Sequence, residues 1–277
     1  MLKLILSSLF IYSYTFVSPL IEMPNIPTVV LHGIASSAYN MNDFSNWIES
    51  SFNTRVFNIE IGSGFKTSIY SPLTEQLVNL CSTIYENEEL KNGFNFIGMS
   101  QGGLLARGYT EQCNEFPVIN LITLVSPHGG ITYDFNWDVY SPFLQNHLSV
   151  AGYWRNPMEL DTYIDKCCYL PILNNEKNTS VSVLQKANMK SLKNFILIWS
   201  ENDGLIFPPE SGKFSFYDDK YNVIDIEETL LYKYDLLGLR YLDEKNSFHI
   251  HETNCTHSQH RDPICFPQLY NILNLYL

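Results

Sequence analysis

Residues 95–108 read NFIGMSQGGLLARG, and this stretch decides which fold the sequence predicts. An apolar strand pattern ends at Ile97, the sequence GMSQGG follows at 98–103, and a helical pattern begins at Leu104. A G-x-S-x-G motif between a strand and a helix is typical of a nucleophile elbow, a strained turn that leaves no room for neighbouring side chains. The N–H groups at the start of such a helix favour negative charge beside the serine. We therefore predict that Ser100 is a nucleophile; the alternative is a small residue at an ordinary strand–helix junction.

Strand and helix patterns alternate along the rest of the chain. Strand patterns cover residues 28–31, 55–59, 95–97, 119–125 and 195–199, and helical patterns end near residue 52 and cover 73–90 and 104–113. This alternation predicts an α/β fold, with a mostly parallel sheet covered by helices on both faces. We expect a single domain over residues 21–277.

A long insertion interrupts that rhythm at about residues 127–191. It is rich in aromatic residues and is broken by several prolines. An insertion of this length in a compact sheet domain is usually functional. We predict a lid whose aromatic side chains line the substrate site; the alternative is that they pack a small core of the insertion itself.

Composition limits the class of partner. The 277 residues are 45% hydrophobic, which is typical of a globular protein. The chain carries 29 acidic against 17 basic residues and a net charge of −12. Nucleic-acid binding needs clustered Lys and Arg to neutralise phosphates, so we expect no nucleic acid as a partner.

Several features predict passage through the secretory pathway. In residues 1–20, a lysine precedes an apolar stretch and small residues, the pattern of a signal peptide; a buried first strand or an uncleaved anchor are the alternatives. No other run of 18 apolar residues occurs, so we expect no transmembrane segment in the mature chain. Six cysteines form an even set without C-x-x-C spacing, which favours disulfides over metal binding. Asn178 and Asn254 begin glycosylation sequons.

A serine nucleophile needs a base and an orienting carboxylate, which follow it in the chain order Ser, acid, His. The strand pattern 195–199 ends in Ser-Glu-Asn-Asp-Gly, which places an acid at the carboxyl end of a strand. We predict that Asp203 is this acid, in preference to Glu201, because Gly204 follows it in a turn. The alternative is that Asp203 only makes a local turn bond.

Four of the seven histidines follow Asp203 and are therefore candidates for the base. They are His249, His251, His257 and His260, whereas His32, His128 and His147 come before the acid. His249 and His251 alternate within a strand pattern, which favours a place in the sheet. His257 lies in the loop that follows, where it can reach over the elbow. We predict His257 as the base, with His260 as the second choice.

An oxyanion hole requires two backbone donors. We predict that they are the N–H groups of Ile34, in the turn after the first strand, and of Gln101, which follows the nucleophile. His32 in this turn is expected to be structural, with a ring that holds the loop. This chemistry requires no cofactor.

The sequence resembles the palmitoyl-protein thioesterases from about Pro27 to the C-terminus. The resemblance rests on VVLHGIASS at 29–37, NFIGMSQGGLLARG at 95–108, YWRNP at 153–157, SENDGLIFPPES at 200–211 and DIEETLLYKYDLLGLRYL at 225–242. It implies an α/β-hydrolase fold, a triad of Ser100, Asp203 and His257, and a bridge between Cys81 and Cys113. The surroundings of Pro127 and Asp203, and the pair Cys255 and Cys265 that flanks His257, are similar to the second, lysosomal branch of the family. Adjacent Cys167 and Cys168 could bridge each other or pair with neighbours.

The resemblance implies a lysosomal or secreted serine enzyme that hydrolyses long-chain fatty acyl thioesters. Palmitoyl-CoA and S-palmitoyl proteins are the expected substrates. Two alternatives stay open from the residues alone: a secreted carboxylesterase or lipase that acts on oxygen esters, and a binding protein of the same fold without activity. The intact order of serine, acid and histidine argues against the second alternative.

Overall fold

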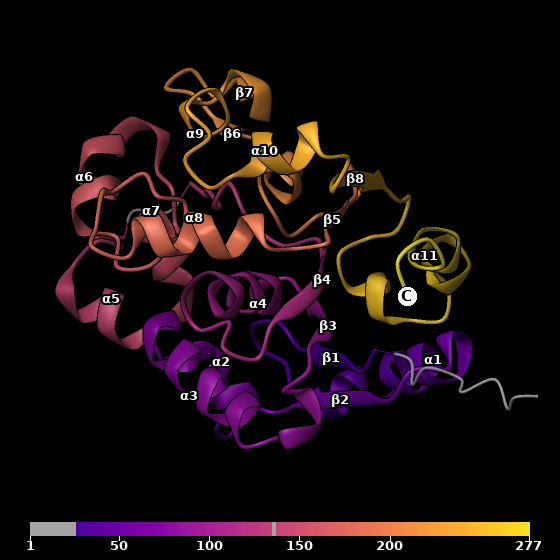
Figure 1. The fold of residues 1–277 in the computed structure, drawn as a ribbon. Helices are drawn as coiled ribbons and strands as arrows, with labels where there is room; N and C mark the ends of the chain where they lie inside the picture. The colour runs from indigo at the N-terminus through magenta and orange to yellow at the C-terminus, as the bar shows by residue number, and fades with distance from the viewer. Residues whose placement is uncertain (1–25, 135–136) are drawn as a thin grey trace, which may run out of the picture.

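A six-stranded sheet, in which every pair of neighbouring strands is parallel, forms the centre of the molecule (Figure 1). The structure is a computed structural model that describes residues 26–134 and 137–277, so the signal peptide predicted at residues 1–20 lies outside the described residues. The strand order is β2-β1-β3-β4-β5-β8. The strands are β1 (Thr28–Leu31), β2 (Val56–Ile59), β3 (Phe94–Met99), β4 (Val118–Leu124), β5 (Asn194–Trp199) and β8 (Phe248–Glu252). The predicted α/β class is confirmed.

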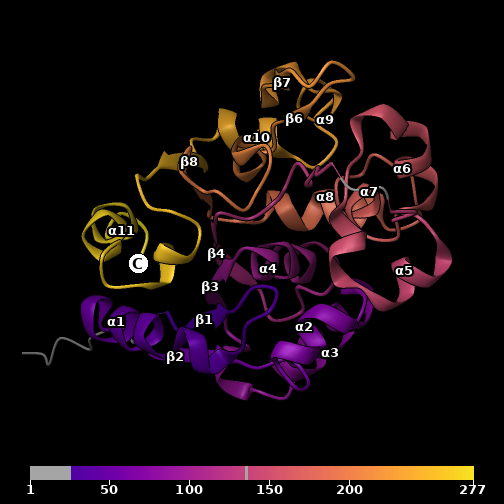
Figure 2. The ribbon, with the colours of Figure 1, turned by 180° about the vertical axis from the view of Figure 1, so that it is seen from behind.

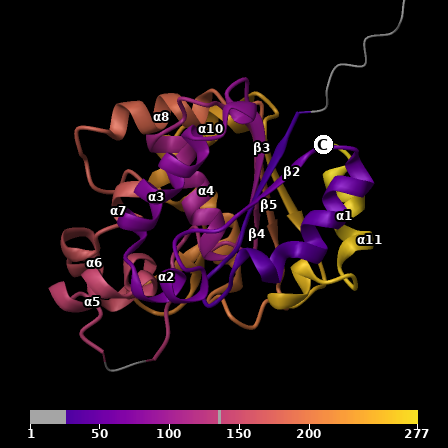
Figure 3. The same cartoon turned by 90° about the horizontal axis from the view of Figure 1, so that it is seen from below.

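Helices cover both faces of this sheet, as the view along its edge shows (Figure 3). One face carries α3 (Leu73–Tyr85), α4 (Gln101–Gln112), α8 (Ser182–Lys190) and α10 (Leu239–Glu244), and the other carries α1 (Asn42–Phe52) and α11 (Phe266–Leu273). Successive strand residues point to opposite faces. Val29 and Leu31 accordingly join the core under α3 and α4, whereas Val30 joins the core under α1 and α11.

The insertion between β4 and β5 forms a helical layer beside the main body (Figure 2). It contains α5 (Pro142–His147), α6 (Leu160–Lys166), α7 (Leu170–Leu173) and α8. Four of its aromatic residues, Tyr140, Tyr153, Trp154 and Tyr163, are at most 6% exposed. Aromatic side chains buried to this degree contribute to packing. These four belong to the same hydrophobic cluster as the residues under α3 and α4, so they pack the insertion onto the main core.

Smaller elements lie after β5 and near the amino end of α3. A two-stranded antiparallel sheet joins β6 (Phe216–Tyr217) to β7 (Val223–Ile224), and the remaining short helices are α2 (Phe65–Tyr70) and α9 (Leu230–Lys233). Among the described residues, no helix combines the length and the apolar character that a bilayer crossing needs.

Two helix boundaries differ from those that the sequence predicts. The helix predicted over 73–90 ends at Tyr85, because Asn87 caps a separate short turn by accepting a hydrogen bond from the N–H of Glu89. The helix predicted from Leu104 begins three residues earlier, at Gln101. Its first turn, Gln-Gly-Gly, has low intrinsic helix propensity, so packing against the sheet holds it.

Two disulfides brace the helices around the sheet. Cys81 of α3 is bonded to Cys113 at the end of α4, and Cys255 is bonded to Cys265 across the loop that contains His257. Cys167 and Cys168 are both free thiols, the first buried and the second exposed, so they form no vicinal bridge.

Removing the Cys81–Cys113 bridge should destabilise the protein without changing its chemistry. The bridged residues are 32 positions apart, and opening a loop of this size raises the entropy of the unfolded chain. We expect the double variant Cys81→Ser/Cys113→Ser to lose about 3 kcal/mol of unfolding free energy in urea titrations. A Cys168→Ser variant, which removes only an exposed free thiol, is the control. Equal midpoints for the parent and the double variant would contradict this expectation.

Candidate active site

Ser100 occupies the sharp turn between β3 and α4. Its φ is 55° and its ψ is −127°, a conformation that non-glycine residues rarely adopt. The turn is held because the Ser100 N–H donates to the carbonyl oxygen of Leu124 on β4 at 2.8 Å. A Cβ on Gly98 would lie 2.5 Å from the carbonyl oxygen of Gly102, and one on Gly102 would lie 2.4 Å from that of His32. Both glycines are therefore required for this close approach.

The loop after β1 lies against the nucleophile. A Cβ built on Gly33 would be 2.9 Å from the Cβ of Ser100. The N–H groups of Ile34 and Gln101, the two predicted oxyanion donors, make no hydrogen bond to another described residue. The Gln101 side chain is buried and donates to the carbonyl oxygen of Ser68 at 2.9 Å. Backbone N–H groups that no other described residue uses are the kind of donor that the predicted oxyanion hole requires.

Asp203 lies just beyond the carboxyl end of β5 and is 3% exposed. Its Oδ1 accepts the N–H groups of Leu205 at 2.9 Å and Ile206 at 2.7 Å. Gly204, with a φ of 73°, makes the tight turn that brings these donors to the carboxylate. Two backbone donors satisfy a buried carboxylate and hold its orientation. The local turn bonds that the alternative interpretation expected thus exist, but they leave Oδ2 free to act on a further group.

That further group is His257. Its Nδ1 lies 2.8 Å from Oδ2 and 3.0 Å from Oδ1 of Asp203, and its backbone N–H donates to the Asp203 carbonyl oxygen at 2.9 Å. A carboxylate only accepts, so Nδ1 carries the hydrogen and Nε2 is the nitrogen left for proton transfer. His257 is 7% exposed.

The other three histidines after Asp203 use their ring nitrogens elsewhere. His260 is fully buried; its Nδ1 donates to the Thr256 carbonyl oxygen at 2.9 Å and its Nε2 lies 2.7 Å from Thr253 Oγ1. His249 Nε2 lies 3.1 Å from an oxygen of Asn194, and His251 Nε2 lies 2.8 Å from the Tyr276 hydroxyl. Burial lowers the pKa of all three rings.

The loop that carries His257 is joined to the loop after β1. Arg261, at the end of a 3₁₀ turn over Ser258–Arg261, donates to Ser36 Oγ at 3.1 Å. Ser36 belongs to the same loop as Gly33, which contacts Ser100. The His257 loop is therefore hydrogen-bonded to Asp203 at one end and to the loop after β1 at the other. Within the described residues, no hydrogen bond joins Ser100 Oγ to His257, an arrangement common in unliganded hydrolases, where this bond tightens when substrate binds.

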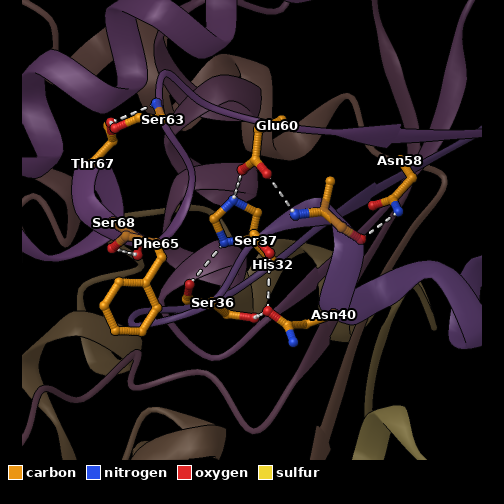
Figure 4. A network of polar contacts seen from close by, with 12 residues as sticks. His32, Ser36, Ser37, Asn40, Asn58, Glu60, Ser63, Phe65, Thr67 and Ser68 are labelled. Carbon is orange, nitrogen blue, oxygen red and sulfur yellow. Dashed lines mark hydrogen bonds and ion pairs between the residues drawn. The ribbon is translucent and has the colours of Figure 1, made fainter.

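The sequence interpretation missed the group that holds His32. The ring of His32 is buried, with Nδ1 2.9 Å from the Gly33 carbonyl oxygen and Nε2 2.7 Å from Oε1 of Glu60 (Figure 4). Glu60 directly follows β2, and the register pairs Leu31 with Ile59. Knowing that β1 and β2 are in-register neighbours would have placed Glu60 beside His32.

The two predicted glycosylation sites lie at the surface. Asn178 and Asn254, the sequon asparagines, are both exposed. In the part of the chain that the structure describes, no group of three or more His, Cys, Asp or Glu residues is arranged to hold a metal ion.

Comparisons with known proteins show the family of the chain. The family model described as palmitoyl protein thioesterase matches residues 27–257. Palmitoyl-protein thioesterase 3 of Dictyostelium discoideum is 35% identical over 269 residues, which cover 91% of this chain and 92% of that protein. A lysosomal thioesterase PPT2 homolog of Drosophila melanogaster is 30% identical over 233 residues, 79% of this chain and 80% of that protein. The crystal structure of a Paleococcus ferrophilus monoacylglycerol lipase is similar to this fold, with a TM-score of 0.51 and 16% sequence identity. The match covers 91% of this chain and 95% of the lipase, and it supports the α/β-hydrolase fold. The chain belongs to the palmitoyl protein thioesterase family.

Proposed function

We propose that this protein is a serine thioesterase that hydrolyses long-chain fatty acyl thioesters through an acyl-serine intermediate. Two observations support the proposal: the Asp203–His257 hydrogen bond after β5 and the serine in a strained turn after β3, which both follow the carboxyl ends of strands in one parallel sheet. Membership of the family supports the class of ester. In the proposal Ser100 is the nucleophile, His257 the general base and Asp203 the carboxylate that orients it.

The first half of the reaction forms the acyl-enzyme. Ser100 Oγ attacks the thioester carbonyl carbon while His257 Nε2 takes its proton, and the carbonyl oxygen becomes negatively charged between the N–H groups of Ile34 and Gln101. The C–S bond then breaks, and the leaving sulfur takes the proton from His257 Nε2 and departs as the thiol, which returns the imidazole to its neutral form. Because a thiol has a pKa of about 8.5, it is a far better leaving group than an alcohol and needs little help from the imidazolium.

The second half releases the fatty acid. Water attacks the acyl-serine carbonyl carbon while His257 Nε2 accepts a proton from that water, and the same two N–H groups hold the negative charge. The Ser100–acyl bond then breaks, and the imidazolium returns its proton to Ser100 Oγ. Asp203 stabilises the imidazolium in both halves without taking the proton.

The acyl chain needs an apolar surface, and we propose that the start of the insertion supplies part of it. Tyr133 packs against Trp154 and Phe207, with ring centroids 5.7 and 5.5 Å apart. Its hydroxyl donates to the Leu205 carbonyl oxygen, two residues after Asp203. Burial and the nearby Asp203 raise the pKa of Tyr133, so this hydroxyl keeps its proton. Phe207 and Leu205 are 39% and 54% exposed, which leaves apolar surface beside the acid.

We further propose that the protein acts in the lysosome or after secretion. Two disulfides are typical of oxidising compartments, and both sequon asparagines are exposed. The Drosophila relative is named as a lysosomal thioesterase, which supports the lysosome.

The test compares palmitoyl-CoA, acetyl-CoA, an S-palmitoylated protein and a matched palmitoyl oxygen ester at acidic and neutral pH. Each buried methylene contributes about 0.8 kcal/mol, so we expect kcat/KM to rise steeply with acyl length. We expect palmitoyl-CoA to react faster than the oxygen ester. Faster hydrolysis of the oxygen ester would show a carboxylesterase or lipase, and indifference to chain length would exclude an acyl-binding surface.

A further inference from the structure

The ring of His32 is held between two groups that can only accept hydrogen bonds. One is the carbonyl oxygen of Gly33, 2.9 Å from Nδ1, and the other is the carboxylate of Glu60, 2.7 Å from Nε2 (Figure 4). A neutral imidazole has a single N–H. One ring nitrogen therefore faces the Gly33 carbonyl oxygen while the other is held by the Glu60 carboxylate. Among the described residues, Glu60 is the only titratable group that forms an ion pair or hydrogen bond with the ring, and Arg261 is hydrogen-bonded to the loop at Ser36.

Glu60 is itself held in place from two directions. Its Oε2 accepts the N–H of Ala38 at 3.0 Å, so the carboxylate spans the loop from His32 to Ala38. On its other side lies Gly64, which has a φ of 59° and where a Cβ would come within 2.7 Å of the carboxylate. The backbone thus approaches the carboxylate closely at a position that favours glycine.

The contact from His32 to Gly33 acts on the oxyanion hole. The carbonyl of Gly33 and the N–H of Ile34 belong to one peptide unit, and in a trans peptide they point in opposite directions. A ring that holds the carbonyl therefore also sets the direction of the Ile34 N–H. A rotation of this peptide would replace the donor with a carbonyl oxygen, which repels the developing negative charge.

We propose that Glu60 is a positioning residue for the reaction: through His32 it orients the Gly33–Ile34 peptide so that the Ile34 N–H can serve the oxyanion hole. This inference rests on the proposed function, in which Ile34 is an oxyanion donor.

The variants Glu60→Ala and Glu60→Gln separate this role from simple support of the loop. Alanine removes both contacts of the carboxylate. Glutamine can donate from its amide nitrogen to His32 Nε2 and accept the Ala38 N–H with its oxygen, which satisfies a neutral ring. The matched control is Asn58→Ala, because Asn58 donates to the Ala38 carbonyl oxygen at 2.7 Å and supports the same loop without touching His32 (Figure 4).

The measurements are kcat and KM for palmitoyl-CoA between acidic and alkaline pH, with thermal unfolding of each variant. Full loss of an oxyanion donor lowers kcat by about 10²–10³-fold, so we expect Glu60→Ala to lower it by about 10- to 100-fold with KM nearly unchanged. We expect Glu60→Gln to restore most of kcat, because its amide can make both contacts of the carboxylate. Asn58→Ala should keep the parent kcat.

Three outcomes would overturn the inference. They are a parent-like kcat in Glu60→Ala, equal losses in Glu60→Ala and Asn58→Ala, and no recovery of kcat in Glu60→Gln. Failure of the proposed function looks different: the parent protein would then bind a fluorophosphonate at Ser100 yet leave palmitoyl-CoA intact.

Discussion

The Ser100→Ala variant should lose at least about 10³-fold of kcat for palmitoyl-CoA while it remains folded, because the members of a catalytic triad act as a unit. Alanine removes the only atom that forms the acyl-enzyme and leaves the backbone of the turn unchanged. The Ser100 side chain makes no hydrogen bond within the described part of the chain, so its loss leaves no buried partner unsatisfied. We expect thermal unfolding within a few degrees of the parent.

A second serine at the same edge of the sheet provides the control. Ser126, two residues beyond β4, is 1% exposed, and its hydroxyl donates to the Leu124 carbonyl oxygen at 3.3 Å. Ser126→Ala should keep both turnover and covalent labelling by a fluorophosphonate, whereas Ser100→Ala should lose both. Labelling that survives in Ser100→Ala would place the nucleophile elsewhere and would remove the basis of the proposed function.

The elbow could be predicted from the sequence because its determinants are local. A strand pattern, two glycines around a serine and a helical pattern lie within 14 residues, and this combination is typical of the elbow whatever the rest of the chain contributes. Asp203 could be predicted for the same reason, since the glycine that shapes its turn is the next residue. The start of α4 was placed three residues too late, because its Gln-Gly-Gly turn has low helix propensity and is held by the sheet.

Contacts between distant parts of the chain could not be predicted in this way. The pairing of His32 with Glu60 depends on the register of β1 against β2, and the tie from Arg261 to Ser36 joins residues 225 positions apart. Neither Glu60 nor Arg261 carries a sequence signal of its own. The insertion shows the same limit, since its aromatic composition is compatible with a lid and with an internal core.

Both missed contacts act on one short loop. Glu60, directly after β2, pairs with His32 and accepts the N–H of Ala38. Arg261, in the His257 loop, donates to Ser36. The proposed oxyanion donor Ile34 lies between these anchor points. The loop has no regular secondary structure around Ile34. The position of the Ile34 N–H therefore depends on the side chains that anchor the loop.

The choice between His257 and His260 can be decided by a matched pair of variants. His257→Ala should lower kcat by at least about 10³-fold at every pH, since it removes the base on which Ser100 depends. His260→Gln should change the stability of the protein and keep kcat per labelled active site within about 10-fold, because both ring nitrogens of His260 are used by Thr253 and Thr256. The loss of these buried contacts should cost about 1–3 kcal/mol.

The pH dependence of unfolding provides a second readout for His260. Burial lowers the pKa of its ring, so the folded protein holds His260 neutral at pH values where the unfolded chain, with a His pKa of about 6.5, binds a proton. The parent should therefore lose stability as pH falls below about 6.5, and His260→Gln should lose less over the same range. Guanidinium unfolding midpoints between acidic and neutral pH measure this difference. If His260→Gln abolished turnover and His257→Ala did not, His260 would be the base, and the Asp203–His257 pair would be a structural contact beside the site.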